Sequence, residues 1–102
     1  MTMTKKTVDS SKPAILAAAV SLARKVGLFH FSRIDVANEA DVGESTVSYH
    51  FGPMPDLRTA VVRHAVEHEI LSILADARSS RESVGVPMSE DLRKKVAAHI
   101  AR

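Results

Sequence analysis

The stretch from Ser32 to Phe51 constrains the fold of this 102-residue chain more than any other part of its sequence. Between its two halves, Val42-Gly43 predicts a tight turn, because glycine adopts backbone angles that other residues resist. The first half carries apolar residues at helical spacing, which predicts a short helix packed against a core. These residues are Ile34, Val36, Ala37 and Ala40.

The second half of this stretch predicts a short helix that is mostly polar. Val47 is its apolar anchor and Phe51 closes its end. This arrangement is typical of a helix-turn-helix. Its first helix packs against the core, and its second helix offers hydrogen-bond donors and acceptors to a major groove of DNA. The side chains left to project outward are Ser45, Thr46, Ser48, Tyr49 and His50.

Over roughly residues 13–68 the chain resembles the N-terminal DNA-binding domain of TetR-type transcriptional regulators. That family has an Ile-Ala pair, then Ala-Gly-Val, a Thr-Leu-Tyr-x-Tyr/His-Phe run, and a charged turn followed by Leu. A glycine usually ends the first helix. The corresponding residues here are Val36-Ala37, Ala40-Asp41-Val42, Thr46-Val47-Ser48-Tyr49-His50-Phe51, Asp56-Leu57 and Gly27.

The chain departs from the family pattern at three places. Ser48 stands where the family commonly has a tyrosine that grips phosphate, and Gly43 stands where a capping serine is usual. The turn Gly52-Pro53-Met54-Pro55 replaces one that often carries lysine. Each departure weakens the expected grip on the DNA backbone, so the resemblance implies modest affinity or help from basic residues elsewhere.

The resemblance implies a DNA-binding head over residues 13–55. The start of the chain is polar with little periodicity, which predicts a mobile basic arm over residues 1–12; it would either lie along DNA or be a plain terminus. Its recognition helix would run from about Glu44 to His50, with Thr46 against a phosphate. Arg33 would reach a base edge or a phosphate, although an ion pair with Asp35 or with another surface acid is the alternative for this residue. The expected DNA-binding residues are Arg33, Glu44, Ser45, Thr46, Ser48, Tyr49 and His50, with Lys5, Lys6 and Lys12 from the arm.

Helical periodicity and capping residues predict an all-α chain of about five helices. Ser10 or Ser11 would cap the first helix, Ser32 the second and Ser89 the last. A long fourth helix, capped by Asp56, would run to Arg78, roughly 35 Å. Residues 56–102 would form a homodimer through a surplus apolar face. Its expected members are Val62, Val66, Ile70, Ile73, Leu74, Leu92, Val96 and Ile100.

The net charge of +2 is unevenly distributed. Residues 1–25 hold five basic residues against one acidic residue, whereas residues 26–58 hold two against five. DNA binding draws most of its non-specific affinity from phosphate neutralisation, so an acidic reading head is unfavourable and basic arms would have to offset it. The same acidic balance favours an alternative function, a small protein-interaction adaptor or anti-repressor.

Other classes of function find little support in the sequence. The chain has no cysteine, no apolar run near the ~20 residues of a membrane span, and no leader-like start, so we expect a cytoplasmic protein. It has no glycine-rich phosphate loop and no nucleophile motif, so we expect neither an enzyme nor a cofactor. TetR-type regulators carry a much longer C-terminal domain for a small-molecule effector; about 45 residues follow the head here, and no effector is expected.

One further motif is His64-Ala65-Val66-Glu67-His68, which matches the inverted zinc-peptidase pattern H-x-x-E-H. Histidines four residues apart share a helix face and can hold a metal ion. A catalytic site would also need a third ligand and a substrate cleft, for which a chain of this length has little room. The alternatives are a regulatory or adventitious metal site and plain surface histidines, and we expect no metal.

The sequence therefore predicts a transcriptional regulator that binds double-stranded DNA as a homodimer on a near-palindromic operator, with repression as its expected action.

Overall fold

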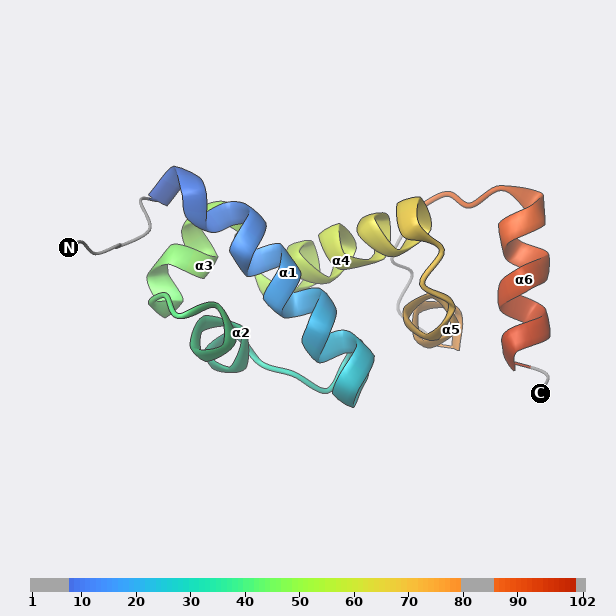
Figure 1. Ribbon diagram of the computed structural model, residues 1–102, viewed down its shortest axis with the longest axis horizontal. Helices are drawn as coiled ribbons and strands as arrows, with labels where there is room; N and C mark the ends of the chain where they lie inside the picture. The colour runs from blue at the N-terminus through green and yellow to red at the C-terminus, as the bar shows by residue number, and fades with distance from the viewer. Residues whose placement is uncertain (1–7, 80–85, 101–102) are drawn as a thin grey trace.

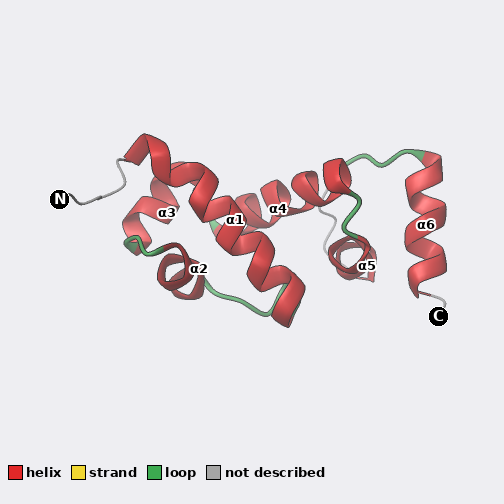
Figure 2. Cartoon of the chain, in the orientation of Figure 1, coloured by secondary structure: helices red, strands yellow, loops and turns green. Residues whose placement is uncertain are grey.

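The computed structural model describes residues 8–79 and 86–100, and in these parts the chain is built from helices and connecting loops without a strand (Figure 2). The predicted all-α class is confirmed, and the described residues form six helices in place of the expected five. The principal extents are 49 × 23 × 21 Å, with α2 and α3 toward one end and α6 at the other (Figure 1). The helices are α1 (Val8–Val26), α2 (Arg33–Ala40), α3 (Glu44–Phe51), α4 (Met54–His68), α5 (Leu71–Ser79) and α6 (Glu90–Ile100).

Helix α1 is the centre of the fold and packs against α2, α3, α4 and α5 (Figure 1). Its buried side is narrow, because Ala18, Ala19 and Ala23 lie there beside Ile15. Small side chains let neighbouring helices approach closely, and so one helix can serve four partners. The first four helices thereby share one core. Helix α6 packs on α5, at the far end from α3.

Helix α1 begins at Val8, earlier than expected, so Pro13 lies inside the helix and not at its start. Ser11, one of the two expected caps, is buried within the helix. The expected mobile arm of residues 1–12 is therefore helical from residue 8 onward, and residues 1–7 lie outside the described parts of the chain. The predicted end of this helix is confirmed, since Gly27 follows it with φ +107°.

The predicted cap of α2 is confirmed as a reciprocal capping box. The Asp35 amide donates to Ser32 Oγ, and the Ser32 amide donates to Asp35 Oδ2 at 2.9 Å. The turn after α2 differs from the prediction. Asp41, with φ 58°, adopts the left-handed conformation, whereas Gly43 has φ −79° and needs no glycine freedom. Aspartate tolerates the left-handed region better than most residues, which explains this choice.

Replacing Asp41 by valine should lower the free energy of unfolding by about 1–2 kcal/mol, because a β-branched residue is strained at positive φ. Asp41→Gly is the matched control and should cost little, since glycine adopts this conformation freely. Urea unfolding followed by circular dichroism measures both. Equal stabilities of the two variants would show that the left-handed turn is not at Asp41.

The expected long fourth helix is broken in two at Glu69. This residue adopts φ 52° and caps α4, and the amide of Ile70 donates to the Ala65 carbonyl at 2.9 Å. That pattern closes a helix C-terminus and turns the chain. Helix α4 also starts at Met54, so Asp56 lies in its first turn and is not its cap. Beyond the break, α5 folds back and packs against α4, α1 and α6.

The fold covers most of the apolar face that was assigned to a dimer. Five of its eight expected members are buried within this one chain, and Ile73 and Leu74 of α5 are fully buried. Those five side chains do not form a free surface, because α5 and α6 supply the partner that a second chain was expected to provide. The buried five are Val62, Ile73, Leu74, Leu92 and Val96; Val66 and Ile70 are half-buried, and Ile100 is exposed.

Ser89 caps helix α6, as predicted. Its Oγ accepts a hydrogen bond from the Leu92 amide at 3.1 Å. An ion pair joins Lys95 of α6 to Glu69 at the α4–α5 corner, with Nζ and Oε1 2.8 Å apart. The hydrogen bond and the charge of Glu69 raise the pKa of Lys95 above its ordinary value. Both side chains are about half exposed, so solvent screening makes this pair a minor contribution to stability.

Candidate nucleic-acid interface

Helix α3 has one buried side and one exposed side. Val47 is 1% exposed and belongs to the core, whereas Tyr49 is 73% exposed, the largest exposure among the large apolar and aromatic side chains described. Ser45 lies four residues before Tyr49, so the two share the outward face, and Ser45 is exposed as well. Val47 therefore anchors α3 in the core, and of the five side chains expected to project outward only Ser45 and Tyr49 are exposed.

The flanks of this outward face carry Thr46, Ser48 and His50, all of them half-buried. The rings of Tyr49 and His50 meet edge to face, with centroids 5.2 Å apart and planes at 81°. With 73% of its surface exposed, Tyr49 is not packed against α1.

Two of the basic residues expected on DNA lie beside α2 and α3. Arg33 opens α2; its side chain is half-buried, and its Nε is covered with no hydrogen-bond partner in residues 8–79 and 86–100. The carboxylate of Asp35 accepts hydrogen bonds from Ser32, as a helix cap. Lys12 of α1 is exposed, and its Nζ lies 5.6 Å from the centre of the Phe51 ring.

The Lys12 contact brings a cation from α1 to the C-terminal end of α3, across 38 intervening residues of sequence. Sequence spacing gave no indication of this contact. Lys5 and Lys6, the other two basic residues expected on DNA, lie outside the described part of the chain. The described cations of the interface are therefore Arg33 and Lys12.

Ile34 was expected in the core and is instead 51% exposed. It lies two residues before the buried Val36, and a helix turns by about 200° over two residues, so the two point in opposite directions. This periodicity was present in the sequence and would have placed Ile34 outside. Exposed acidic groups share the region: Asp35, Glu39, Asp41 and Glu44.

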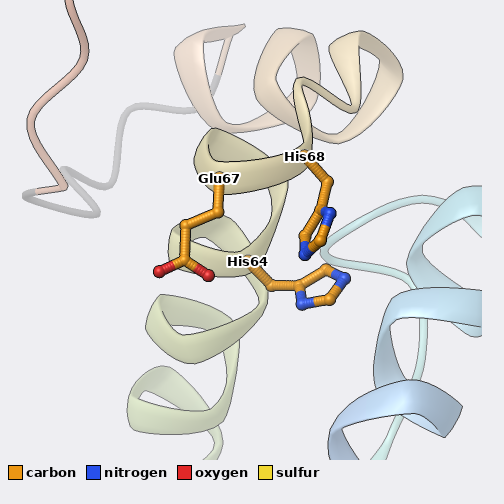
Figure 3. A group of neighbouring side chains, drawn as sticks. All are labelled: His64, Glu67 and His68. Carbon is orange, nitrogen blue, oxygen red and sulfur yellow. The ribbon is translucent and has the colours of Figure 1, made fainter.

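A second group of polar side chains lies at the end of α4, where His64, Glu67 and His68 project from its last turns (Figure 3). Their potential ligand atoms all lie within 4.8 Å of one another. The two imidazole rings are 4.3 Å apart between centroids and tilted by 35°. His64 is half-buried, and Glu67 and His68 are exposed. The spacing H-x-x-E-H therefore does bring three donors together.

Two open grooves border His64. One, of about 590 Å³, is lined by Leu16, Val20 and neighbouring residues of α1. The other, of about 710 Å³, continues along α4 past Arg63 and Glu67 and reaches His50 and Phe51 of α3. Neither is an enclosed cavity, since both are largely open to solvent.

The comparisons with known proteins give no match: no family model, no curated protein and no solved structure is significantly similar to the chain. Among the described helices, none is long and apolar enough to cross a membrane.

Proposed function

We propose that this protein is a transcriptional regulator of the TetR type that binds double-stranded DNA through α3. The observation that carries the proposal is the asymmetry of α3. Its Val47 is buried in the core, while Tyr49 and Ser45 stand in solvent on the opposite side. A short helix anchored in this way by one apolar residue can enter a major groove without disturbing its own fold.

In this arrangement Ser45 and Tyr49 meet the base edges, and Thr46, Ser48 and His50 on the flanks meet the DNA backbone. Hydroxyl and imidazole groups can donate to phosphate oxygens, and they fix the register of the helix in the groove. Glu44, at the N-terminus of α3, would accept from a cytosine amino group. These contacts are local to one helix, and so the recognition surface is small.

Arg33 and Lys12 supply the positive charge that the acidic head otherwise lacks. Arg33 keeps its guanidinium out of the Ser32–Asp35 cap, and arginine paired with guanine is the commonest specific contact in a major groove. Lys12 stands beside the end of α3, where it would neutralise a phosphate. With few such cations, affinity should be modest and its salt dependence shallow.

A homodimer would place two α3 helices on successive major grooves, roughly 34–36 Å apart, and would read a near-palindromic operator. Because α5 and α6 already cover most of the apolar face, the surface left for such a dimer comprises Val66, Ile70 and Ile100. Occupancy of the operator would repress transcription, and the protein would act in the cytoplasm. Sedimentation equilibrium measures whether the dimer forms.

Selection of bound sequences from a random DNA pool tests the proposal, followed by electrophoretic mobility shift with the selected and with scrambled DNA. We expect a short, near-palindromic consensus, and selected DNA should bind roughly 10³-fold or more tightly than scrambled DNA. A pool that yields no enriched sequence, together with no retardation of DNA at low salt, would refute the proposal.

A second candidate function is a protein-interaction adaptor or anti-repressor. It is favoured by Ile34 and Tyr49, two large exposed side chains, in a region that also exposes four acidic groups. Exposed aromatic and aliphatic residues with surrounding charge are typical of protein-binding surfaces. The low-salt mobility shift discriminates between the two functions, because an acidic protein-binding surface would repel DNA of any sequence.

A further inference from the structure

We propose that His64, Glu67 and His68 bind a divalent first-row transition metal ion at the end of α4. This site lies outside the DNA-binding surface of α3, and its existence does not depend on the proposed function. Imidazole nitrogens with one carboxylate form a ligand set suited to Zn²⁺ and its neighbours. Mg²⁺ and Ca²⁺ prefer oxygen ligands alone, so the two imidazoles select against them.

The helix itself sets the geometry of the site. Residues three and four apart lie on one side of a helix, so His64, Glu67 and His68 project together from the last turns of α4 (Figure 3). Bonds of about 2.0–2.2 Å to zinc place tetrahedral ligand atoms roughly 3.4 Å apart. The present separations of up to 4.8 Å must therefore shorten by about 1.4 Å. Rotation of the exposed Glu67 and His68 side chains can achieve this without moving the backbone.

The surrounding charges are mixed. Helix α4 ends at His68, and the C-terminal end of a helix favours a cation. Glu67 adds a negative charge as a ligand. The two grooves that border His64 also contain basic side chains, which oppose the ion: Arg24 and Lys25 line one, and Lys12 and Arg63 line the other, together with Asp56. The direct metal–ligand bonds must outweigh this repulsion, which a transition metal does better than a purely electrostatic ion.

Three protein ligands leave at least one position of a four-coordinate ion unfilled. The two grooves that border His64 leave room for a water molecule or an exchangeable ligand there. A site of this kind exchanges its metal readily, unlike a closed structural site with four protein ligands. Binding would also brace the last turn of α4, immediately before the left-handed Glu69 at which the chain turns into α5.

Isothermal titration calorimetry of the full chain with Zn²⁺ tests the site, using protein without a polyhistidine tag and without DNA. We expect saturable binding of one ion per chain. The melting temperature should rise by roughly 5–10 °C when free zinc is ten times its dissociation constant. The absence of saturable binding would overturn the proposal and would leave the DNA-binding function untouched.

Variants identify the ligands. Removing a residue that only orients a metal ligand already lowers metal affinity about 10–100-fold. His68 is proposed as a direct ligand, so His68→Ala should weaken zinc binding at least tenfold. His64→Ala/His68→Ala should abolish binding. His99→Ala, a histidine on α6, is the matched control and should bind zinc as the wild type does. Zinc binding that survives in the double variant, or that is lost in His99→Ala, would overturn the assignment. Far-ultraviolet circular dichroism verifies that each variant keeps its helices.

Discussion

Replacing Leu57 by alanine is expected to lower the free energy of unfolding by roughly 2–5 kcal/mol. Leu57 is 1% exposed and lies near the start of α4, the helix that packs against both α1 and α3. Alanine would leave a cavity that the surrounding helices can fill only in part. A domain of this size has a total stability of about 5–15 kcal/mol, so this single change should remove a large share of it. Urea unfolding followed by circular dichroism provides the measurement.

The matched control is Val26→Ala, which shortens an apolar side chain that is 49% exposed at the end of α1. Its effect should stay within about 0.5 kcal/mol, as is usual for surface substitutions. If the two variants were equally stable, Leu57 would not lie in the core, and the packing of α4 beneath α3 would be wrong. The support for the proposed reading helix would weaken with it.

Those parts of the fold that depend on neighbours in sequence could be predicted. Ser32 with Asp35, and Ser89 before α6, cap their helices as expected, because a capping side chain bonds to an amide only three residues away. Gly27 ends α1 for an equally local reason, its positive φ. Such features need no knowledge of the tertiary structure.

The break between α4 and α5, and the packing of α5 against the other helices, could not be predicted in the same way. No glycine or proline marks Glu69, so a continuous helical pattern hid the turn between α4 and α5. The folded-back position of α5 depends on contacts between distant residues. Asp76 Oδ2 accepts from the Leu28 amide at 3.1 Å, across 48 residues. Only this long-range packing reveals that Ile73 and Leu74 belong to the chain's own core.

The candidate interface was predictable as far as helical periodicity reaches. The opposition of Val47 and Tyr49 follows from their spacing alone, and the exposure of Ile34 could have been found by the same reasoning. The position of Lys12 beside Phe51 could not, because it depends on how α1 crosses α3. The spacing thus predicts the exposed face of α3, and the tertiary structure places a cation beside the end of this helix.

Tyr49→Ala is expected to weaken binding to the selected operator by about 1–3 kcal/mol, roughly 5- to 150-fold, if α3 reads the bases. The side chain is 73% exposed, so its removal should leave the helical content and the free energy of unfolding nearly unchanged. Tyr49→Phe separates two contributions: loss of affinity in this variant assigns the contact to the hydroxyl group, and retained affinity assigns it to the ring. Mobility shift with the selected DNA, at fixed salt, measures each affinity.

Thr46→Ala should behave differently, because a contact to phosphate carries no sequence information. It should weaken binding to operator and scrambled DNA by a similar factor, whereas Tyr49→Ala should reduce the ratio between the two. Val26→Ala removes an exposed apolar residue at the end of α1, outside both the proposed DNA contacts and the proposed dimer surface, and should bind both as the wild type does. Full-strength operator binding by both α3 variants would show that another element enters the groove. If Tyr49→Ala still binds scrambled DNA but no longer binds the operator more tightly than scrambled DNA, Tyr49 contacts the bases and α3 is the recognition helix.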